Sequence, residues 1–592
     1  MCQKIELLSD AQVQRFIVDG WLNLSLDELG SDFHAGIYRM ANERRPSGSL
    51  SEEIDSQIPE LRAVLESPTV RGALQGILGS GYIRHPHTGA YVQDIEYISQ
   101  ESPPNFEQGW HRDSYWGVQR VHHHRPRWLI CMYYPAAVRL DMGPTAIAPG
   151  SQYYSLPGDG DGRAQPPPQP IRHDQLDDPE CLMKGDDLSA RDRLLQATLA
   201  SLDPELKESP IVVEAGSFCC FHYDLYHRRL RRLSMYDGTV PPRVMFKFLF
   251  TSGHHRTTPS WAHEEGDPEW NKGPTNPDRR LLWQSIWTSM LGSSSVDSAC
   301  TDEHIPAEKS IARTREIALE SNSEIARMGA AYQLGQDGCG GNTGAVQALI
   351  EVLQHGCDSA RRAAMHGLGA AGPAAVDPLL AMLSRAHTDY YASCGAVHAL
   401  GEAVEVPTVV MVEVIASLMK RVAQVIEKES RLAGGWPAGG GGHPPPSGFP
   451  NKSPNPKERQ AWPPKLLHAT CLQALGLMAQ RASVSGNNAV VQAVIEQFVT
   501  CLGRPEPGGG NPDYPPDSTL GSGCMSRQNA ALGLRILGAS LPRGIDKRMQ
   551  QTVIEACRRA SQDRDIFVAH YSRDALRDML VPKGEGGLQS GN

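Results

Sequence analysis

The 592-residue sequence lacks several features that would place it in a familiar class of protein. Its 13 cysteines are odd in number and include no CxxC pair, and the start MCQKIELLSD has no basic and then apolar leader. No stretch reaches the roughly 18 uninterrupted apolar residues of a membrane span. No long lysine or arginine run is present and the formal net charge is −10. We therefore expect a soluble cytoplasmic protein with reduced thiols and with neither a nucleic-acid nor a membrane partner.

The composition changes near residue 300, from short β-rich runs with glycine and proline to Ala/Leu/Gly-rich segments with helical spacing. This change predicts a multidomain chain. The predicted parts are a first domain at 1–292 with a proline-rich insert at about 157–210, a linker at 293–308, helical repeats at 309–431, a Gly/Pro-rich insert at 432–465, further repeats at 466–583 and a tail at 584–592.

The second half contains a repeat built around a Leu-Gly pair. AAYQLGQ, AAMHGLGAAG and GAVHALGEA align on Leu334, Leu368 and Leu400, and LQALGLM and LRILGAS continue the pattern. Each unit predicts a helix with small residues, a turn and an apolar second helix. One such pair cannot bury its apolar stripe alone, so neighbouring units must stack. The pattern resembles HEAT-like repeats and implies an all-α solenoid.

The stretch GWHRDSYWGVQR places His111 and Asp113 two residues apart. In an extended segment both side chains project to the same side. Three ligands on one face of an octahedron hold a non-heme iron ion and leave positions open for chemistry. We expect the third ligand to be a distant histidine returned by an antiparallel sheet. The segment EAGSFCCFHYDLYHRRLRRL offers His227, which we favour, and His222.

Several ordered motifs resemble those of the phytanoyl-CoA dioxygenase family of iron(II) and 2-oxoglutarate-dependent oxygenases. LLSDAQVQRFIVDGWLNL is similar to its opening helix and strand, WHRD to its WHxD element, MGPTAIAPGSQ to its G-P-x-x-x-x-P-G-S-H loop, and AGSFCCFHYDLYH to its G-D-x-x-x-F-x-x-x-x-x-H segment. The chain departs from the family at Ser217 in place of Asp, at Gln152 in place of the loop histidine, and in HRRLRRLSMYDG. These departures bear on the substrate and on activity.

The resemblance implies a double-stranded β-helix, or jelly roll, with flanking helices. It implies that Fe(II) is held by His111, Asp113 and His227, the catalytic set, with 2-oxoglutarate and O2 as cosubstrates. Arg243, in VPPRVMFKFLF, would bind the far carboxylate of 2-oxoglutarate, since a guanidinium forms a two-pronged donor pair. Gln93 stands where some relatives place a glutamine near the cosubstrate, although an ordinary polar strand residue fits equally.

On the Arg243 strand, Val244, Phe246, Phe248 and Phe250 share the opposite face, which predicts an apolar layer behind a polar lumen, with Lys247 on the side of Arg243. The HHH run at 122–124 predicts a solvated loop rather than an accessory metal site. The arginines at 228, 229, 231 and 232 form either a basic rim for an anionic substrate or an ordinary charged loop.

The repeat half has no repeated His-Glu dyads. His398 and Glu402 lie one helical turn apart but lack counterparts in the other units, so AAMH and GAVH are expected to face the core. We thus expect an Fe(II)/2-oxoglutarate-dependent hydroxylase acting on a small or anionic metabolite or on a recruited partner. The repeats would form a scaffold whose concave surface binds a protein. The alternative is an inactive binding protein that acts through its repeats.

Overall fold

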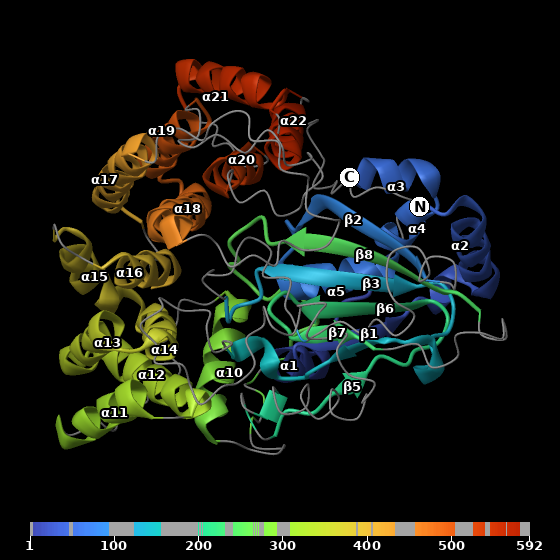
Figure 1. The fold of residues 1–592 in the computed structure, drawn as a ribbon, viewed down its shortest axis with the longest axis horizontal. Helices are drawn as coiled ribbons and strands as arrows, with labels where there is room; N and C mark the ends of the chain where they lie inside the picture. Colours follow the sequence, from blue (N-terminus) through green and yellow to red (C-terminus); the bar gives the residue numbers. More distant parts are fainter. Residues whose placement is uncertain are drawn as a thin grey trace.

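The computed structural model describes most of both halves of the chain. The described residues are 4–46, 51–93, 110, 123–154, 199–200, 203, 205–230, 241–264, 266, 268, 270, 277–292, 308–321, 323–385, 389–403, 407–432, 456–503, 525–538, 545–563 and 565–580. They form a sheet region, which comes first in the chain, and a helical region that curves beside it (Figure 1).

The sheet region combines short helices with eight described strands. Its helices are α1 (Asp10–Asp19), α2 (Ser31–Arg44), α3 (Ser51–Gln57), α4 (Leu61–Glu66) and α5 (Pro68–Leu78), with the 3-10 turns η1 (Asp27–Leu29), η2 (Leu140–Met142) and η3 (Ser151–Tyr153). Its strands are β1 (Trp21–Ser25), β2 (Ile83–Gln93), β3 (Trp128–Tyr134), β4 (Thr145–Ile147), β5 (Ser209–Pro210), β6 (Ser217–His222), β7 (His227–Arg229) and β8 (Arg243–Thr251).

The first helix and strand form where the sequence motif predicts them. Ser9 caps α1 through a capping box, because its side chain accepts from the Gln12 amide at 3.3 Å while the Gln12 side chain accepts from the Ser9 amide at 2.9 Å. Gly20 ends the helix in the left-handed conformation, with φ of 77°. The chain then enters β1 directly.

The strands form two antiparallel sheets. The larger has the order β1-β6-β3-β8-β2, and the smaller has the order β5-β4-β7. In the larger sheet Tyr133 of β3 lies opposite Phe218 of β6 and Phe246 of β8. In the smaller sheet Ile147 lies opposite His227. Strand β5 pairs with β4 although it falls within the expected insert at 157–210.

The two faces of the larger sheet pack against different partners. One face joins the core formed with α1 to α5, and its strand residues include Leu129, Cys131, Tyr133, Phe218, Cys220, Val244, Phe246, Phe248 and Phe250. The other face packs toward the smaller sheet through Ile130, Met132, Phe221, Met245 and Leu249, which cluster with Ile147 of β4. The apolar layer predicted on β8 is therefore confirmed, while the opposite face is mixed rather than wholly polar.

The helical region is built from consecutive helices. They are α10 (Pro277–Leu291), α11 (Glu308–Glu320), α12 (Glu324–Cys339), α13 (Thr343–His355), α14 (Asp358–Ala370), η5 (Gly372–Ala375), α15 (Val376–Leu383), α16 (Tyr390–Ala403), α17 (Val409–Leu432), α18 (Pro456–Val484), α19 (Asn488–Gly503), α20 (Met525–Gly538), α21 (Lys547–Ala560) and α22 (Ile566–Leu580). None of the described helices is both long and apolar enough to cross a membrane.

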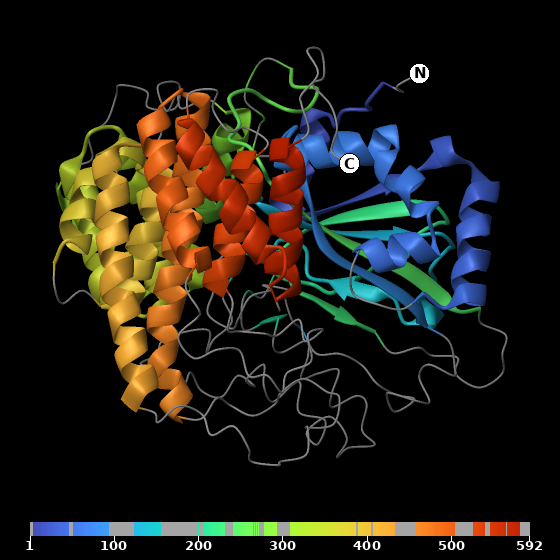
Figure 2. The ribbon, with the colours of Figure 1, turned by 90° about the horizontal axis from the view of Figure 1, so that it is seen from above.

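These helices stack in two layers. Helices α12, α14, α16, α18, α20 and α22 pack in that order, and α11, α13, α15, α17, α19 and α21 form the second row. The first row, here called the inner layer, lies on the side of the sheet region (Figures 1 and 2). The leucines of all five Leu-Gly pairs are buried in inner-layer helices, at 334, 368, 400, 475 and 537. The relation of these stacked helices to HEAT-like repeats stays a prediction.

Helix α18 starts earlier than the expected domain plan places the second set of repeats. Helix α18 begins at Pro456, inside the predicted low-complexity insert at 432–465. Proline is favoured in the first turn of a helix, where no intrahelical partner for its nitrogen is needed, and strong helix formers follow in KERQA. Residues 293–307 of the linker predicted at 293–308, and the whole tail predicted at 584–592, lie outside the described residues.

The inner layer touches the sheet region directly. The ring of His85 in β2 lies 5.0 Å from that of Phe567 and 5.7 Å from that of Tyr571, both in α22. Further along the layer, Arg125 and Arg127, which precede β3, bind Glu402 in α16. The predicted concave surface of the repeats therefore contacts the chain's own first half.

Candidate functional site

His227 opens strand β7 and lies in the space between the two sheets. Only 8% of the residue is exposed. Its Nδ1 lies 3.0 Å from the carbonyl oxygen of Leu225, and because a carbonyl only accepts, the neutral ring carries its proton on Nδ1 and its lone pair on Nε2. A small cavity beside it is lined by Ile130, Met132, Thr145, Ile147, Phe221 and Leu225. His227 is therefore placed and protonated as a metal ligand would be.

His222, the other candidate for the third ligand, points to the opposite side of the larger sheet. It follows Phe218 and Cys220 at two-residue spacing, and both of these face the helix-covered core. Its ring centre lies 6.4 Å from that of Phe16 in α1, and its Nδ1 accepts from the Asp224 amide at 3.2 Å. Burial lowers the pKa of His222, which is thus a neutral core histidine. The geometry favours His227.

Arg243, the predicted carboxylate-binding residue, begins β8 and is 2% exposed. Strand alternation places it on the side of Met245 and Leu249, which both face the smaller sheet. Burial raises the pKa of Tyr134 at the end of β3, and the positive charge of Arg243 opposes that rise, so the guanidinium lies near the Tyr134 hydroxyl. The backbone of Gln93 pairs with Arg243 across β2 and β8, while its side chain lies outside the described structure.

Trp110 is the one described residue of the WHRD element, because His111 and Asp113 lie outside the described residues. Trp110 is 1% exposed, and the guanidinium carbon of Arg228 lies 5.3 Å from the centre of its ring. Arg228 is itself buried and pairs with Glu208 at 2.6 Å. The residue before His111 thus packs against the residue after His227.

Of the four arginines predicted to form a basic rim or a charged loop, Arg228 does neither, because it is buried. Arg228 is 3% exposed, so it does not lie on a solvent-facing rim. Its charge is paired with that of Glu208, and its guanidinium group packs over the indole ring of Trp110. Arg229 is partly exposed, and residues 231 and 232 lie outside the described part of the chain.

The glutamine that replaces the family's loop histidine has a structural role. Gln152 is 1% exposed and its Nε2 donates to the carbonyl of Ile17 at 3.1 Å. The Tyr153 hydroxyl donates to the same carbonyl. Gln152 therefore fastens the loop of residues 142–152 to the end of α1.

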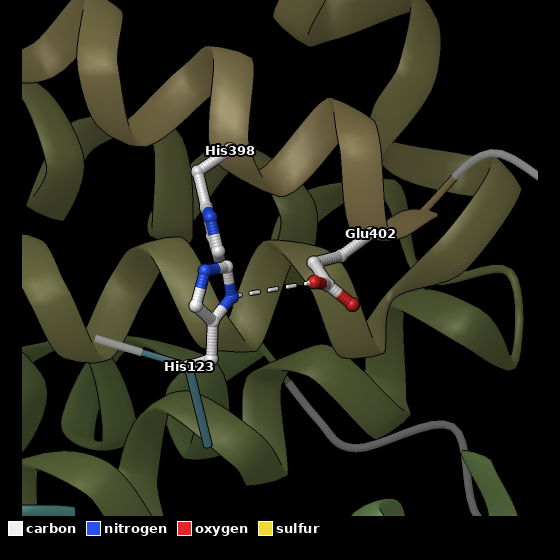
Figure 3. A group of neighbouring side chains, drawn as sticks. All are labelled: His123, His398 and Glu402. Atoms are coloured by element: carbon white, nitrogen blue, oxygen red, sulfur yellow. Dashed lines mark ion pairs between the residues drawn. The ribbon is translucent and has the colours of Figure 1, made fainter. Parts of the chain in front are cut away.

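A second group of potential metal ligands joins the two regions. His123, His398 and Glu402 bring one donor atom each to within 4.8 Å of one another, a composition that can hold a divalent metal ion (Figure 3). His398 and Glu402 come from one face of α16, and His123 comes from the segment before β3. The His123 Nδ1 lies 3.9 Å from a Glu402 oxygen.

The electrostatics of this group argue against a bound cation. The Arg127 guanidinium donates to Glu402 Oε1 at 2.7 Å, and that of Arg125 donates to Oε2 at 2.8 Å. Burial acts to raise the pKa of Glu402, but the two guanidinium groups, together with His398 and His123, hold that pKa well below its usual range. Both carboxylate oxygens are thus already neutralised by fixed positive charge, which a metal ion would have to displace.

This junction was not predicted from the sequence. The HHH run was expected in a solvated loop, but His124 is only 4% exposed, so that prediction is wrong. The missed signal is the repeat itself. Tyr332, His366 and His398 all stand two residues before the leucine of a Leu-Gly pair, in helices whose neighbouring positions are small or apolar. Large polar rings at equivalent repeat positions indicate a shared contact surface rather than an interior.

Comparisons with known proteins give only distant similarities. No protein-family model matches the chain, and no curated protein matches it. Among solved structures, it is similar to the non-heme alpha ketoglutarate dependent carbocyclase SnoK from nogalamycin biosynthesis, with 14% identity over 42% of this chain and 85% of that chain and a TM-score of 0.27.

Two further solved structures show the same level of similarity. EctD from S. alaskensis, solved with 2-oxoglutarate and 5-hydroxyectoine, is 15% identical over 44% of this chain and 82% of its own, with a TM-score of 0.28. AviO1 from Streptomyces viridochromogenes is 13% identical over 42% of this chain and 96% of its own, with a TM-score of 0.26. At these values the similarities decide neither the fold nor the activity of this chain.

Proposed function

We propose that the chain is an Fe(II)/2-oxoglutarate-dependent oxygenase that hydroxylates an unactivated C–H bond, with a double-stranded β-helix formed by the two facing sheets. His111, Asp113 and His227 hold the iron, and Arg243 holds the far carboxylate of 2-oxoglutarate. The ordered motifs of the sequence support this assignment. If the chain were not such an oxygenase, all of these motifs would have had to arise by chance and in the correct order. An acidic ligand at Asp113 favours hydroxylation over halogenation.

The observation that carries the proposal is the contact between Trp110 and Arg228. These residues are 118 positions apart, yet the Arg228 guanidinium carbon lies 5.3 Å from the Trp110 ring centre. Each is covalently joined to a proposed ligand, His111 and His227 respectively. Consecutive Cα atoms are about 3.8 Å apart. The two ligand-bearing segments are thus neighbours in space, as a shared metal ion requires.

The polar groups of the inter-sheet space support the same proposal. His227 offers Nε2, since Nδ1 is bound to a backbone carbonyl. Arg243 stands on the facing wall, and Lys247 shares its side of β8. Two cationic side chains on the wall of a largely apolar space suit a small anionic molecule such as 2-oxoglutarate.

The residues of the chain would bind and orient the reactants. Iron, when bound, supplies the coordination positions for dioxygen and for the cosubstrate, whose oxidation provides electrons. Arg243 fixes the far carboxylate of the cosubstrate, and the apolar lining around His227 limits the entry of water. The substrate would be a small or anionic metabolite or a recruited partner. Such a partner would meet the helical region where its inner layer is not already covered by the sheet region.

Anaerobic titration with iron(II) and 2-oxoglutarate tests the proposal. The wild-type protein should develop the weak visible metal-to-ligand charge-transfer band of a chelated cosubstrate. The variants His111→Ala and His227→Ala should lose it, because each removes a ligand. Succinate release across a panel of metabolites and peptides would then identify the substrate class.

His222→Asn is the matched control. Asparagine keeps an acceptor where His222 Nδ1 receives the Asp224 amide, and position 222 lies on the far face of the sheet, so this variant should keep the band. Correctly folded wild-type protein that takes up iron but shows no band would instead support the alternative, a binding protein that acts through its helical region.

A further inference from the structure

Three equivalent repeat positions form a row of polar rings along the inner layer. Tyr332, His366 and His398 occupy the position two residues before Leu-Gly in α12, α14 and α16, three helices that pack in sequence. They are 4%, 8% and 4% exposed. We call them the ring row. The later units carry Gln473 and Arg535 at this position.

The ring row receives two histidines from the sheet region. His124 Nδ1 lies 2.9 Å from the Tyr332 hydroxyl oxygen, and its ring stacks on that of His366 with centres 3.5 Å apart and planes 15° apart. The ring of His123 lies 4.9 Å from that of His398. Both histidines of this pair come from the segment that leads into β3. Four imidazoles therefore meet where the two regions join.

The junction already carries an excess of positive charge among its described residues. Glu402 is bound by both Arg125 and Arg127, and its backbone carbonyl also accepts from Arg481 in α18. His255, which follows β8, is exposed to the charges of Arg481, Arg127 and Arg125, and burial together with these charges lowers its pKa to about 4. The Glu402 carboxylate is thus paired with two guanidinium groups, and a third binds the backbone beside it.

The other described groups around the row are a tyrosine, further cationic side chains and one carboxylate. Tyr153 meets the His124 ring edge-on at 5.4 Å, and burial raises the pKa of Tyr153. Glu324 and Arg362 line the small cavity beside His124 and His366, so one charge of each sign faces that pair. His222 lies next to the backbone of residues 123 and 124. Burial, and then the charge of Arg127, lower the pKa of Arg256 to about 9.

We propose that this junction is a pH-sensitive latch, in which neutral imidazoles of the ring row and of His123 and His124 hold the helical region on the sheet region, and their protonation releases it. Two imidazoles stacked at 3.5 Å repel each other when both are charged. Each proton added to these imidazoles is also repelled by the guanidinium groups of Arg125 and Arg127, which bind Glu402. The inference concerns the contact between regions and stands independently of the proposed oxygenase activity.

The sign of the effect follows from the burial of these rings. Burial first, and then the neighbouring His123, lower the pKa of His398 well below its ordinary value. The docked state therefore binds fewer protons than the released state once the pH falls through about 6.5. Docking is insensitive to pH above that value and weakens below it. Each histidine that takes up a proton on release weakens docking about tenfold per pH unit.

Small-angle X-ray scattering of the full chain between pH 7.5 and 5.0, with far-ultraviolet circular dichroism on the same samples, tests the latch. We expect the radius of gyration to increase as the pH falls while the helical signal is kept. His366→Phe and His398→Gln should each shift the expansion to lower pH and reduce its slope by about tenfold per pH unit. His355→Gln removes an exposed histidine from α13 and should change nothing.

Four outcomes would overturn the proposal. The first is a wild-type radius that stays constant to pH 5.0 with the helices intact. The second is expansion that coincides with loss of the helical signal, because that is global unfolding. The third is expansion that added Zn²⁺ prevents and EDTA restores, since the junction would then be a metal site. Two variants with unchanged midpoints and slopes would also contradict the role of the histidines.

Discussion

The two regions of the molecule fill their interiors in opposite ways. The larger sheet packs on its helices with big rings such as Tyr133, Phe246 and Phe248. The inner layer of the helical region uses glycine and alanine, so its backbones approach closely. A Cβ on Gly335 would lie 2.5 Å from the Gly367 carbonyl oxygen, and one on Gly367 would lie 2.4 Å from that of Ala331.

This difference explains where each region places its polar side chains. Two facing sheets are separated by about 10 Å of side chains. Groups such as His227 and Arg243 can therefore sit between them. Helices in near backbone contact leave no such space, and their large polar rings are displaced to the surface of the layer. The candidate site therefore lies in the sheet region, whereas the helical region uses polar groups to bind its neighbour.

Glu402→Gln should have the largest effect, because Glu402 connects the two regions. It leaves Arg125 and Arg127 without their carboxylate at a buried junction, which we expect to lower the free energy of unfolding by about 3 kcal/mol at pH 7. Urea unfolding followed by circular dichroism measures the change. Glu351→Gln, in an exposed pair with Arg315, is the matched control and should cost less than about 0.5 kcal/mol.

The pH dependence of this variant gives a second check. The pKa of Glu402 is held well below the ordinary value of 4.5 in the folded protein. While the two regions stay docked, its contribution is thus fully present above that value and is lost as the pH falls through the lower folded pKa. Wild type and variant should converge in strong acid. A constant difference at all pH values would show that the carboxylate charge is not responsible.

Arg243→Met should weaken 2-oxoglutarate binding about 100-fold, since two charge-assisted hydrogen bonds are lost together. Arg243→Lys keeps the charge but not the paired donors and should lose less, about tenfold. Anaerobic titration of the charge-transfer band at fixed iron(II) measures both affinities. Iron uptake should stay unchanged in both variants. Equal affinities in wild type and Arg243→Met would place the cosubstrate elsewhere.

Sequence patterns predicted which face a residue occupies better than which partner it meets. Alternation on β8 correctly placed Val244, Phe246 and their neighbours against the helices, because strand periodicity alone fixes the face. The Leu-Gly spacing likewise marked inner-layer helices. Periodicity carries no information about distant segments. The contact of His123 and His124 with α14 and α16 could not be derived from it.

The same limit applies to the candidate site. Residue types and order pointed to His227 and Arg243, and both lie on the inter-sheet space, but this does not test His111 and Asp113, which remain predictions. Arg228 was misjudged because charge in a sequence favours solvent exposure. Its real partners, Glu208 and Trp110, are 20 and 118 residues away. Burial of a charge depends on such tertiary pairing.

Gly335→Ala tests the close packing of the helical region. The added Cβ would meet the Gly367 carbonyl at 2.5 Å, and backbone cannot move aside as a flexible side chain can. We expect a loss of about 2 kcal/mol in the free energy of unfolding, as for other overpacked interiors. Gly476→Ala is the control within α18, where the nearest atom lies 3.9 Å away.

The control should be neutral or stabilising by up to about 1 kcal/mol, because alanine favours helix more than glycine. Thermal and urea unfolding of both variants measure the contrast. Equal changes at the two positions would show that the helices do not depend on backbone approach at Gly335.

Removal of a helix N-cap should have the smallest effect on stability, and this effect should be the same in the two regions. Ser9 caps α1 in the sheet region, and Asn342 caps α13 in the helical region, where its side chain accepts from the Ala345 amide at 3.2 Å. Ser9→Ala and Asn342→Ala should each lower the free energy of unfolding by about 1 kcal/mol. Because a cap acts within one turn, the two costs should agree even though the interiors differ. Urea unfolding of the two variants measures this. A cost at one cap several times that at the other would show that the regions differ in local helix stability as well as in packing.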